Sequence, residues 1–239
     1  MKTRFLIITA IVTLSIIILS SNVMTIEAYH NDKTSRGSSE PEIATFGTNA
    51  YVVWEESMDP QFSDVYFRKI VDNSSSFDEA INLTLGTSFY PDPSILASKN
   101  NVYVLWEDRI DPDGKESVYF KKSNDDGKTF DNTITLDPTT NDSIYRPITM
   151  LESNGILYVF VSHWNPQTQR NNLSFITSDD NGNAFSDPVI LFESEQWEQS
   201  AHIIVKDDVI YAVADDANNY DEAGDLNFRK IYSDKSTSK

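Results

Sequence analysis

Six residues offer the side chains best suited to chemistry, because each stands where a short apolar run begins or ends. Two are tyrosines, three are carboxylic acids and one is an arginine, a set that would suit a pocket for cations or polar sugars. They are Tyr90, Asp92, Glu107, Asp108, Tyr145 and Arg146. We expect these residues to bind a ligand, while the sequence assigns no catalytic residue.

The charge and composition of the chain limit its partners. Its 239 residues include 37 Asp and Glu against 19 Lys and Arg, for a formal net charge of -18. Such a charge repels phosphate backbones, so nucleic acid is excluded as a partner. The absence of cysteine excludes disulfides, thiol nucleophiles and cysteine-ligated metals. The hydrophobic content of 39% is sufficient for a folded core.

Much of the acid excess is predicted to lie in loops on one face. Glu55, Glu107 and Asp215 stand at equivalent positions, where they either line a pocket or act as solvated charges that keep an exported protein soluble. The segment 111–114, together with Glu116, either binds calcium loosely or forms a type I turn. Apart from that loose calcium, we expect no metal and no cofactor.

The N-terminal residues predict export. Lys2 and Arg4 precede an uncharged apolar run over residues 5–19, which is typical of a secretory signal. We therefore expect residues 1–28 to be a signal peptide or an N-terminal anchor, and residues 29–39 to be a polar linker, in a secreted or cell-surface protein. Four N-x-S/T sequons fit an exported surface and predict N-glycosylation. Their acceptors are Asn73, Asn82, Asn141 and Asn172.

An internal repeat organises the rest of the chain. Two aromatic markers recur with the same period of about 53 residues, which chance does not explain. The tyrosines are Tyr51, Tyr103, Tyr158 and Tyr211, and the phenylalanines are Phe67, Phe120, Phe175 and Phe228. Each marker lies in a short run rich in Val, Ile, Tyr and Phe, which predicts a strand.

Each unit reads as a four-stranded meander, here named strands A to D in chain order. Strand A is predicted at 41–45, 93–97, 147–151 and 201–205, and strand D at 80–83, 133–136 and 189–192. The Tyr runs are strands B and the Phe runs are strands C. The units span 40–89, 90–143, 144–198 and 199–239. Repeated radially, such units predict an all-β fold, a β-propeller domain over 40–239 with four blades. The last blade lacks its outer strand, so the propeller is either a compact ring or incomplete and open.

A turn motif between strands C and D carries a family resemblance. The pattern S-x-D-x-G-x-T-F occurs once in full, once with Ala184 in the Thr position, and in decayed form over 72–77. Its residues are Ser123, Asp125, Gly127, Thr129 and Phe130, then Ser178, Asp180, Gly182 and Phe185. The motif resembles the Asp-box of the sialidase, or BNR-repeat, propellers. The resemblance covers about residues 40 to 239 and implies that these turns are structural and lie opposite the ligand face.

The sequence departs from that family in two respects. The family's enzymes resemble six-bladed rings, whereas four units are present here. Their mechanism implies three arginines that grip a carboxylate, and only Arg109, Arg146 and Arg170 remain for the loop face. Trp164 and Trp197, in loops, either stack on a sugar ring or pack against the scaffold, and His163 is interpreted as a packing residue.

These observations favour a secreted or cell-surface sialidase-like propeller that acts as a binding or interaction module for extracellular glycan or protein ligands. One alternative is an exo-sialidase or related glycoside hydrolase with a degenerate arginine triad. Another is a surface assembly unit that completes its propeller with another chain, through self-association at the unfinished last blade.

Overall fold

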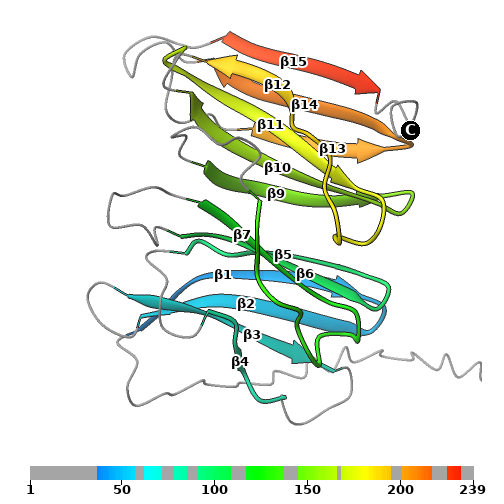
Figure 1. The fold of residues 1–239 in the computed structure, drawn as a ribbon. Coiled ribbons are helices and arrows are strands. Elements are labelled where there is room, and N and C mark those ends of the chain that lie inside the picture. The colour runs from blue at the N-terminus through cyan, green and yellow to red at the C-terminus, as the bar shows by residue number, and fades with distance from the viewer. Residues whose placement is uncertain are drawn as a thin grey trace, which may run out of the picture.

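The computed structural model describes residues 37–57, 62–71, 78–84, 91–108, 117–136, 145–165, 168–194, 201–216 and 225–232. Within these residues the chain forms fifteen strands and no helix. The strands make four antiparallel sheets, numbered one to four in chain order (Figure 1). The described residues therefore contain the four predicted blades.

Each sheet is a meander of consecutive strands. Sheet one contains β1 (Gly37–Phe46), β2 (Asn49–Ser57), β3 (Ser63–Ile70) and β4 (Ile81–Asn82). Sheet two contains β5 (Ser94–Ser98), β6 (Asn101–Asp108), β7 (Ser117–Ser123) and β8 (Ile134–Thr135). Sheet three contains β9 (Tyr145–Ser153), β10 (Ile156–Asn165), β11 (Arg170–Ser178) and β12 (Val189–Ser194). Sheet four contains β13 (Ala201–Lys206), β14 (Val209–Asp216) and β15 (Asp225–Tyr232), three strands within the described residues.

The strands follow the predicted order, with one difference at the start of the first sheet. β1 begins at Gly37, inside the range predicted to be a linker, because Gly37 and Ser39 pair with Ser57 and Glu55. The pairing uses backbone groups and needs no apolar side chain. Glu40, in the shifted part of this register, has a positive φ of 46°.

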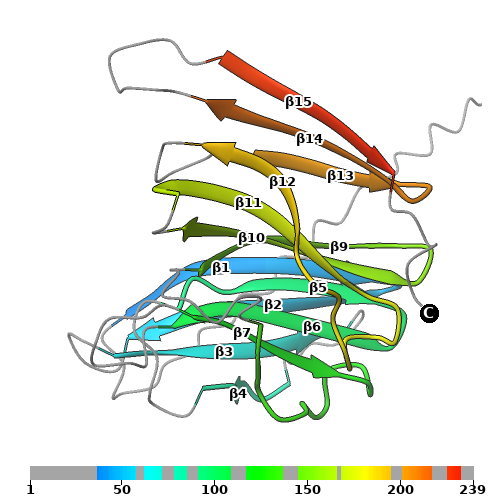
Figure 2. The ribbon, with the colours of Figure 1, turned by 45° about the horizontal axis from the view of Figure 1, so that its top comes forward.

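The sheets are arranged as an arc. The innermost strands contact one another in the order β1, β5, β9 and β13. In Figure 1 sheets one and four lie at opposite ends of the stack, and in Figure 2 sheet four again lies at one end, beyond sheet three. Of the two predicted arrangements, ring or open propeller, the described residues therefore adopt the open one.

Three apolar clusters join consecutive sheets, so the core lies between blades. Tyr51, Val53 and Phe67 of sheet one are buried against Val104 and neighbouring residues of sheet two. Equivalent clusters join sheets two and three and sheets three and four. Because the second strand of sheets one to three is covered on both faces, its sequence reads as a continuous apolar run instead of an alternating one.

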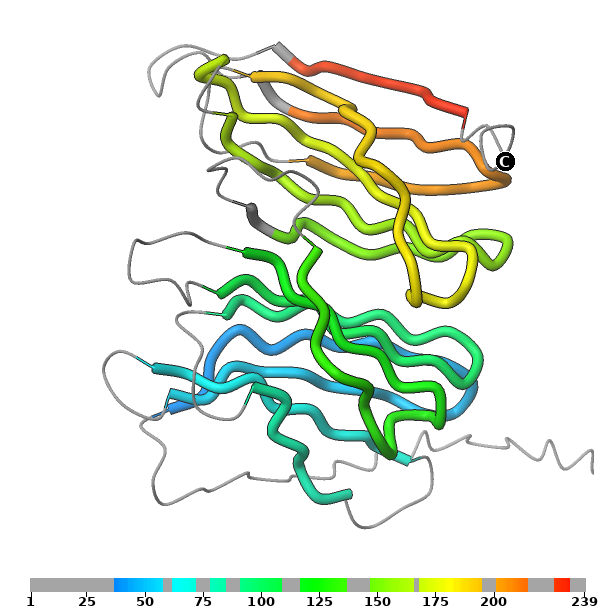
Figure 3. The backbone as a smooth tube through the Cα atoms, viewed as in Figure 1, coloured from blue at the N-terminus to red at the C-terminus, as the bar shows by residue number. Residues whose placement is uncertain are grey.

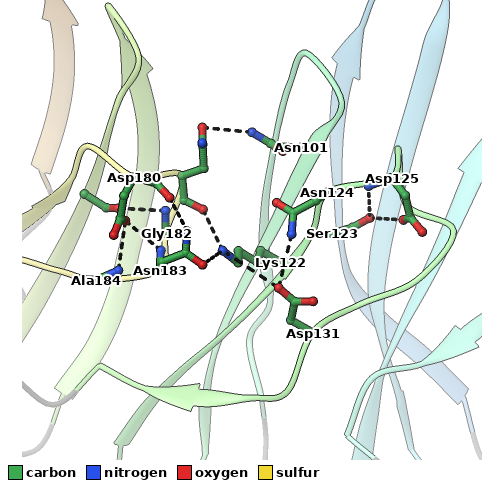
Figure 4. Close-up of polar contacts among 12 residues, drawn as sticks. Asn101, Lys122, Ser123, Asn124, Asp125, Asp131, Asp180, Gly182, Asn183 and Ala184 are labelled. Carbon is green, nitrogen blue, oxygen red and sulfur yellow. Dashed lines mark hydrogen bonds and ion pairs between the residues drawn. The ribbon is translucent and has the colours of Figure 1, made fainter.

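The 123–130 turn is closed by its own serine and aspartate. Ser123 Oγ accepts the Gly127 amide proton at 2.9 Å, and Asp125 Oδ1 accepts that of Thr129 at 2.9 Å. The Thr129 hydroxyl also donates to Asp125, and these bonds to the charged form lower the pKa of Asp125 to about 2. The 178–185 turn repeats the arrangement with Ser178 and Asp180 (Figure 4).

Each of these turns packs on the sheet before its own. The backbone trace shows the segment between β11 and β12 (yellow) extending from sheet three toward sheet two (Figure 3). Phe130 meets Phe67 of sheet one edge to face at a centroid distance of 4.9 Å, and Phe185 meets Phe120 of sheet two at 5.3 Å. A Cβ at Gly127 would lie 2.6 Å from the Phe67 ring. Glycine is thus required both by its φ of +81° and by this close approach.

Polar bonds repeat the same junction. Asp126, in the 123–130 turn, accepts hydrogen bonds from Tyr51 and Lys69 of sheet one. In the next junction Lys122 of sheet two binds the side chain of Asn183 and donates to the Asn181 carbonyl at 3.3 Å (Figure 4). A tyrosine, a phenylalanine and a lysine on one sheet therefore hold the turn of the next sheet.

Candidate functional site

We call the edge where the second strand of each sheet ends the loop edge. Of the residues predicted to bind ligand, the structure describes Asp92, Glu107 and Asp108 at this edge, together with the backbone of Tyr145 and Arg146. The loop edge lies opposite the edge that carries the 123–130 and 178–185 turns. Tyr90 lies outside the described residues, as do the side chains of Tyr145 and Arg146. The backbone register nevertheless pairs Tyr145 with His163 and Arg146 with Ser162. These two residues therefore lie on sheet three, next to its central strand.

The predicted acids of sheet two lie around the end of β6. The Glu107 amide donates to the Pro91 carbonyl at 2.9 Å, which holds the segment containing Asp92 against this strand. Asp92 has a positive φ of 35°, an uncommon conformation for a residue with a side chain. Asp108 is buried and is the cross-strand partner of Ser117. Asp92, Glu107 and Asp108 therefore belong to one corner of sheet two, whereas Tyr145 and Arg146 belong to sheet three.

The acids of sheet one differ from the solvated charges that one interpretation expected. Glu55, Glu56 and Asp64 are all buried. Asp64 accepts hydrogen bonds of 2.8 Å from both Asn82 and Thr84, which lie on or beside β4. Glu56 accepts from the Trp54 indole at 3.2 Å. Because hydrogen bonds offset the cost of burying these carboxylates, Glu56 and Asp64 brace the loop edge of sheet one.

A row of polar residues crosses the loop edge of sheet three. Cross-strand pairing places His163 beside Asn172, and Asn172 beside Glu193. The Asn172 amide and His163 Nε2 are 3.3 Å apart. Burial lowers the pKa of His163, so the ring is neutral at pH 7 and Nε2 can accept this bond. His163 is therefore held inside the blade, where it packs beneath the loop edge.

Above this row lies an open hollow of about 460 Å³. It is lined by Trp164, Thr168, Gln169 and Arg170, which flank the connection between β10 and β11. The Thr168 amide donates to Asn165 at 3.2 Å, and Gln169 adopts a positive φ of 54°, so a tight turn presents these side chains. The hollow combines an indole, an amide, a hydroxyl and a guanidinium group.

The guanidinium group of the hollow has an acidic neighbour. Arg170 lies 3.7 Å from Glu193 of β12, and both side chains are about half exposed. Sequence reasoning named Trp164 and Arg170 separately and missed Gln169 and Glu193. β12, the strand that follows the 178–185 turn, pairs with β11 so that Ser194 lies opposite Asn171 and Glu193 lies opposite Asn172. This register brings Glu193 close to Arg170. Of the three arginines kept for the loop face, the structure describes the side chain of Arg170 alone.

Two further predictions concern metals and glycans. Within the described part of the chain, no three His, Asp or Glu side chains converge on a possible metal site. The segment considered for calcium, residues 111–116, lies outside that part, as do Asn73 and Asn141. Asn82 donates to Asp64, and Asn172 is buried and contacts His163. Asn82 is partly buried, so Asn172 is the less accessible of these two acceptors, and glycosylation itself stays a prediction.

Comparisons with known proteins identify the fold. No protein-family model matches the chain, and no curated protein matches it in sequence. Among solved structures, the Hadza microbial sialidase Hz136 is similar with a TM-score of 0.63 and 14% identity, over 84% of this chain and 45% of that one. The intramolecular trans-sialidase from Ruminococcus gnavus is similar with a TM-score of 0.63 and 10% identity, over 87% of this chain and 70% of that one. The GH93 α-L-arabinofuranosidase of Fusarium graminearum has a TM-score of 0.58 and 12% identity, over 86% of this chain and 66% of that one.

These similarities define a β-propeller of the type found in sialidases and other glycoside hydrolases. The chain spans less than half of the length of the Hadza sialidase. At such low identities the similarity establishes the fold and leaves the activity open. In the described residues no helix is long and apolar enough to cross a membrane.

Proposed function

We propose that this chain is a sialidase-like propeller module that binds glycans at the loop edge of sheet three. The hollow beside Trp164 carries the proposal. Its volume of about 460 Å³ lies within the usual range for small-ligand sites, roughly 300 to 1,000 Å³. An indole face can stack on a sugar ring, while Gln169, Arg170 and Thr168 supply hydrogen-bonding groups for ring hydroxyls or a sugar carboxylate.

The predicted leader and the turns support the rest of this assignment. An exported module meets extracellular glycans, and fractionation of cells that express the chain tests that location. The geometry of the 123–130 and 178–185 turns supports placing the chain with the BNR-repeat, or Asp-box, propellers. A protein ligand would bind at the same loop edge. A glycan screen distinguishes glycan ligands from protein ligands, because only a glycan-binding chain gives a signal in it.

Binding to a glycan array, followed by titration of the best ligand, tests the proposal. Replacing Trp164 with Ala is expected to weaken binding by roughly 5- to 150-fold, because the stacking of a ring on an aromatic side chain contributes about 1–3 kcal/mol in single-stranded nucleic-acid sites. Arg170→Lys keeps the charge but loses the planar fork, so a smaller loss is expected. Phe46→Ala is the matched control, because Phe46 is an exposed aromatic residue at the opposite edge. Glycan binding that survives Trp164→Ala in a folded variant would contradict the proposal.

Glycoside hydrolysis is the second candidate, favoured by the neighbouring folds and by the carboxylates Asp92 and Glu107 near the start of β5 and the end of β6. Glycosidases commonly use two carboxyl groups, one as an acid and one as a base or nucleophile. Fluorogenic sialosides and α-L-arabinofuranosides test this directly. Turnover that disappears in Glu107→Gln, while glycan binding persists, would establish hydrolysis. If neither substrate class is turned over and glycan binding depends on Trp164, the chain is a binding module and the hydrolase candidate is rejected.

A further inference from the structure

Sheet four buries one of its faces and exposes the other. Ile210, Ala212 and Ala214 of β14 are buried against sheet three. The alternate residues of the three strands form the opposite side of the sheet, because side chains along a strand point to the two faces in turn. We call this second surface the head face. Cross-strand pairing defines its apolar part, which consists of Ile204, Tyr211, Val213, Leu226, Phe228 and Tyr232.

The apolar residues of the head face are exposed, whereas the preceding sheets bury their counterparts. Leu226 is 76% exposed and Phe228 is 67% exposed. The register places Val65, Val118 and Leu173 at the position of Leu226, and Phe67, Phe120 and Phe175 at the position of Phe228. These counterparts are at most 5% exposed, because each lies in the cluster that joins its sheet to the next one. An exposed apolar patch of this kind marks an interaction site.

A cation on the head face lies against aromatic rings. Lys69 and Lys122, at the same register position in sheets one and two, reach the turn of the following sheet. Lys230 instead lies 5.6 Å from the ring centre of Tyr211 and 5.0 Å from that of Tyr232. The attraction between the ammonium group and these rings keeps it over the sheet. The head face is therefore an apolar surface with a positive charge toward one end.

The outer face of sheet one, at the other end of the arc, is covered at its centre. Trp54 is 8% exposed and Tyr66 is 9% exposed. Their rings stack at 5.7 Å, and Arg68 lies 5.7 Å from the centre of the Trp54 ring. Of the two outer faces that the described residues form, the head face is therefore the open one. A second copy that uses this surface alone must present the same surface in return, which makes the contact isologous.

The two ends of the head face have complementary charges. Lys206 and Lys230 belong to this side of the sheet and lie toward the turn between β13 and β14. Asp215 stands opposite Leu226 in the register, toward the loop edge. If a two-fold axis runs between two packed head faces, perpendicular to the strands, the lysine end of each copy meets the Asp215 end of the other. Such pairing favours association in a chain with a net charge of -18, whose acids otherwise repel a second copy.

We propose that two copies of this chain pair through their head faces across this two-fold axis. Each sheet four then forms one layer of a two-sheet sandwich, an arrangement in which antiparallel sheets bury their apolar faces. Leu226 and Phe228 become covered, as their counterparts are within the arc, and Lys230 approaches Asp215 of the second copy. The pairing is independent of the proposed glycan site, which lies at the loop edge of sheet three.

The mass of the full chain in solution, measured by light scattering and sedimentation over a range of concentrations, tests the pairing. The chain of 27.1 kDa is expected to reach a two-chain mass as its concentration rises and to form nothing larger. Phe228→Asp should weaken this association by about 30-fold, the loss typical of a dominant interface position. Because Phe228 is mostly exposed in the single chain, the fold tolerates the charge. Ile43→Asp is the matched control, since Ile43 is 63% exposed on the outer face of sheet one, and it should leave association unchanged.

Exchanging charges tests the orientation of the two copies. Lys230→Asp and Asp215→Lys should each weaken association, because each places like charges together at both ends of the contact. The two substitutions in one chain reverse the pair and should restore most of the association. A double variant that associates no better than the single variants would overturn the proposed two-fold arrangement.

A single introduced thiol distinguishes this contact from other arrangements of two chains. The chain has no cysteine, and Val213 lies on the central strand of sheet four. A short bismaleimide should join two Val213→Cys chains, because this position meets its own copy near the two-fold axis, and should not join two Ile43→Cys chains. Cross-linking through Ile43→Cys instead of Val213→Cys would overturn the proposal. A single-chain mass at every concentration, or association that Phe228→Asp leaves unchanged, would overturn it as well.

Discussion

A substitution at Gly127 tests whether the turns join neighbouring sheets. Gly127 has a φ of +81°, and an added Cβ would lie 2.6 Å from Cζ of Phe67 in the preceding sheet. The left-handed backbone costs a residue with a side chain about 1–2 kcal/mol. Overpacking against a buried ring adds about 1–3 kcal/mol. Gly127→Ala is therefore expected to lower the free energy of unfolding by roughly 2–5 kcal/mol.

Gly155 supplies a matched control for this substitution. Its φ is also +81°, but no atom lies within 4 Å of the position of an added Cβ. Gly155→Ala should therefore cost only the backbone strain of about 1–2 kcal/mol. Denaturant titrations followed by intrinsic fluorescence measure both values. Equal losses for the two variants would refute the claim that Gly127 is needed for contact with sheet one, whereas a larger loss at Gly127 measures that contact.

Two other predictions concern the same turns. Because the pKa of Asp125 is lowered from 3.8 to about 2, its stabilising contribution is present above pH 4 or so and is lost as the pH falls toward about 2. Asp125→Asn should flatten the acid limb of the pH dependence of the unfolding midpoint. An acid limb identical to that of the unsubstituted chain would contradict this assignment. Tyr51→Phe removes the hydroxyl that donates to Asp126 and should destabilise the chain by about 1–2 kcal/mol in the same titration, while an unchanged midpoint would show that the bond contributes nothing. The pKa of Tyr51 is raised to about 12, chiefly by burial, so spectroscopic titration of Tyr51→Phe should lack a tyrosine that ionises near that pH.

The fold was largely predictable because the repeat marks its buried strands. Tyr51 and Phe67 lie in runs buried on both faces, and their counterparts recur at a constant period. Strand ends were harder to predict. β1 starts earlier than expected because backbone pairing at Gly37 leaves no mark in side-chain pattern, and β4 and β8 shrink to two residues each.

The candidate site was predictable only in part. The sequence places Trp164 and Arg170 near the end of one hairpin. Their grouping with Gln169 and Glu193 depends on the backbone conformation at Thr168 and Gln169 and on the register of β12. Amino-acid composition counts every Asp and Glu as one negative charge. In the structure, however, Asp64 is buried and hydrogen-bonded and braces the loop edge, whereas Glu193 faces solvent. Such distinctions arise from tertiary packing and cannot be read from residue type.

The packing of each turn on the preceding sheet has a consequence for how this chain can vary. Lys69 and Asp126 are 57 positions apart, and Lys122 and Asn183 are 61 apart, so partners lie more than one repeat from each other. Covariation among homologous sequences should therefore be strongest between adjacent repeats and weak within one. Recombination that duplicates or deletes a whole blade separates a lysine from its turn, and such events should persist mainly where the new neighbours restore the pair.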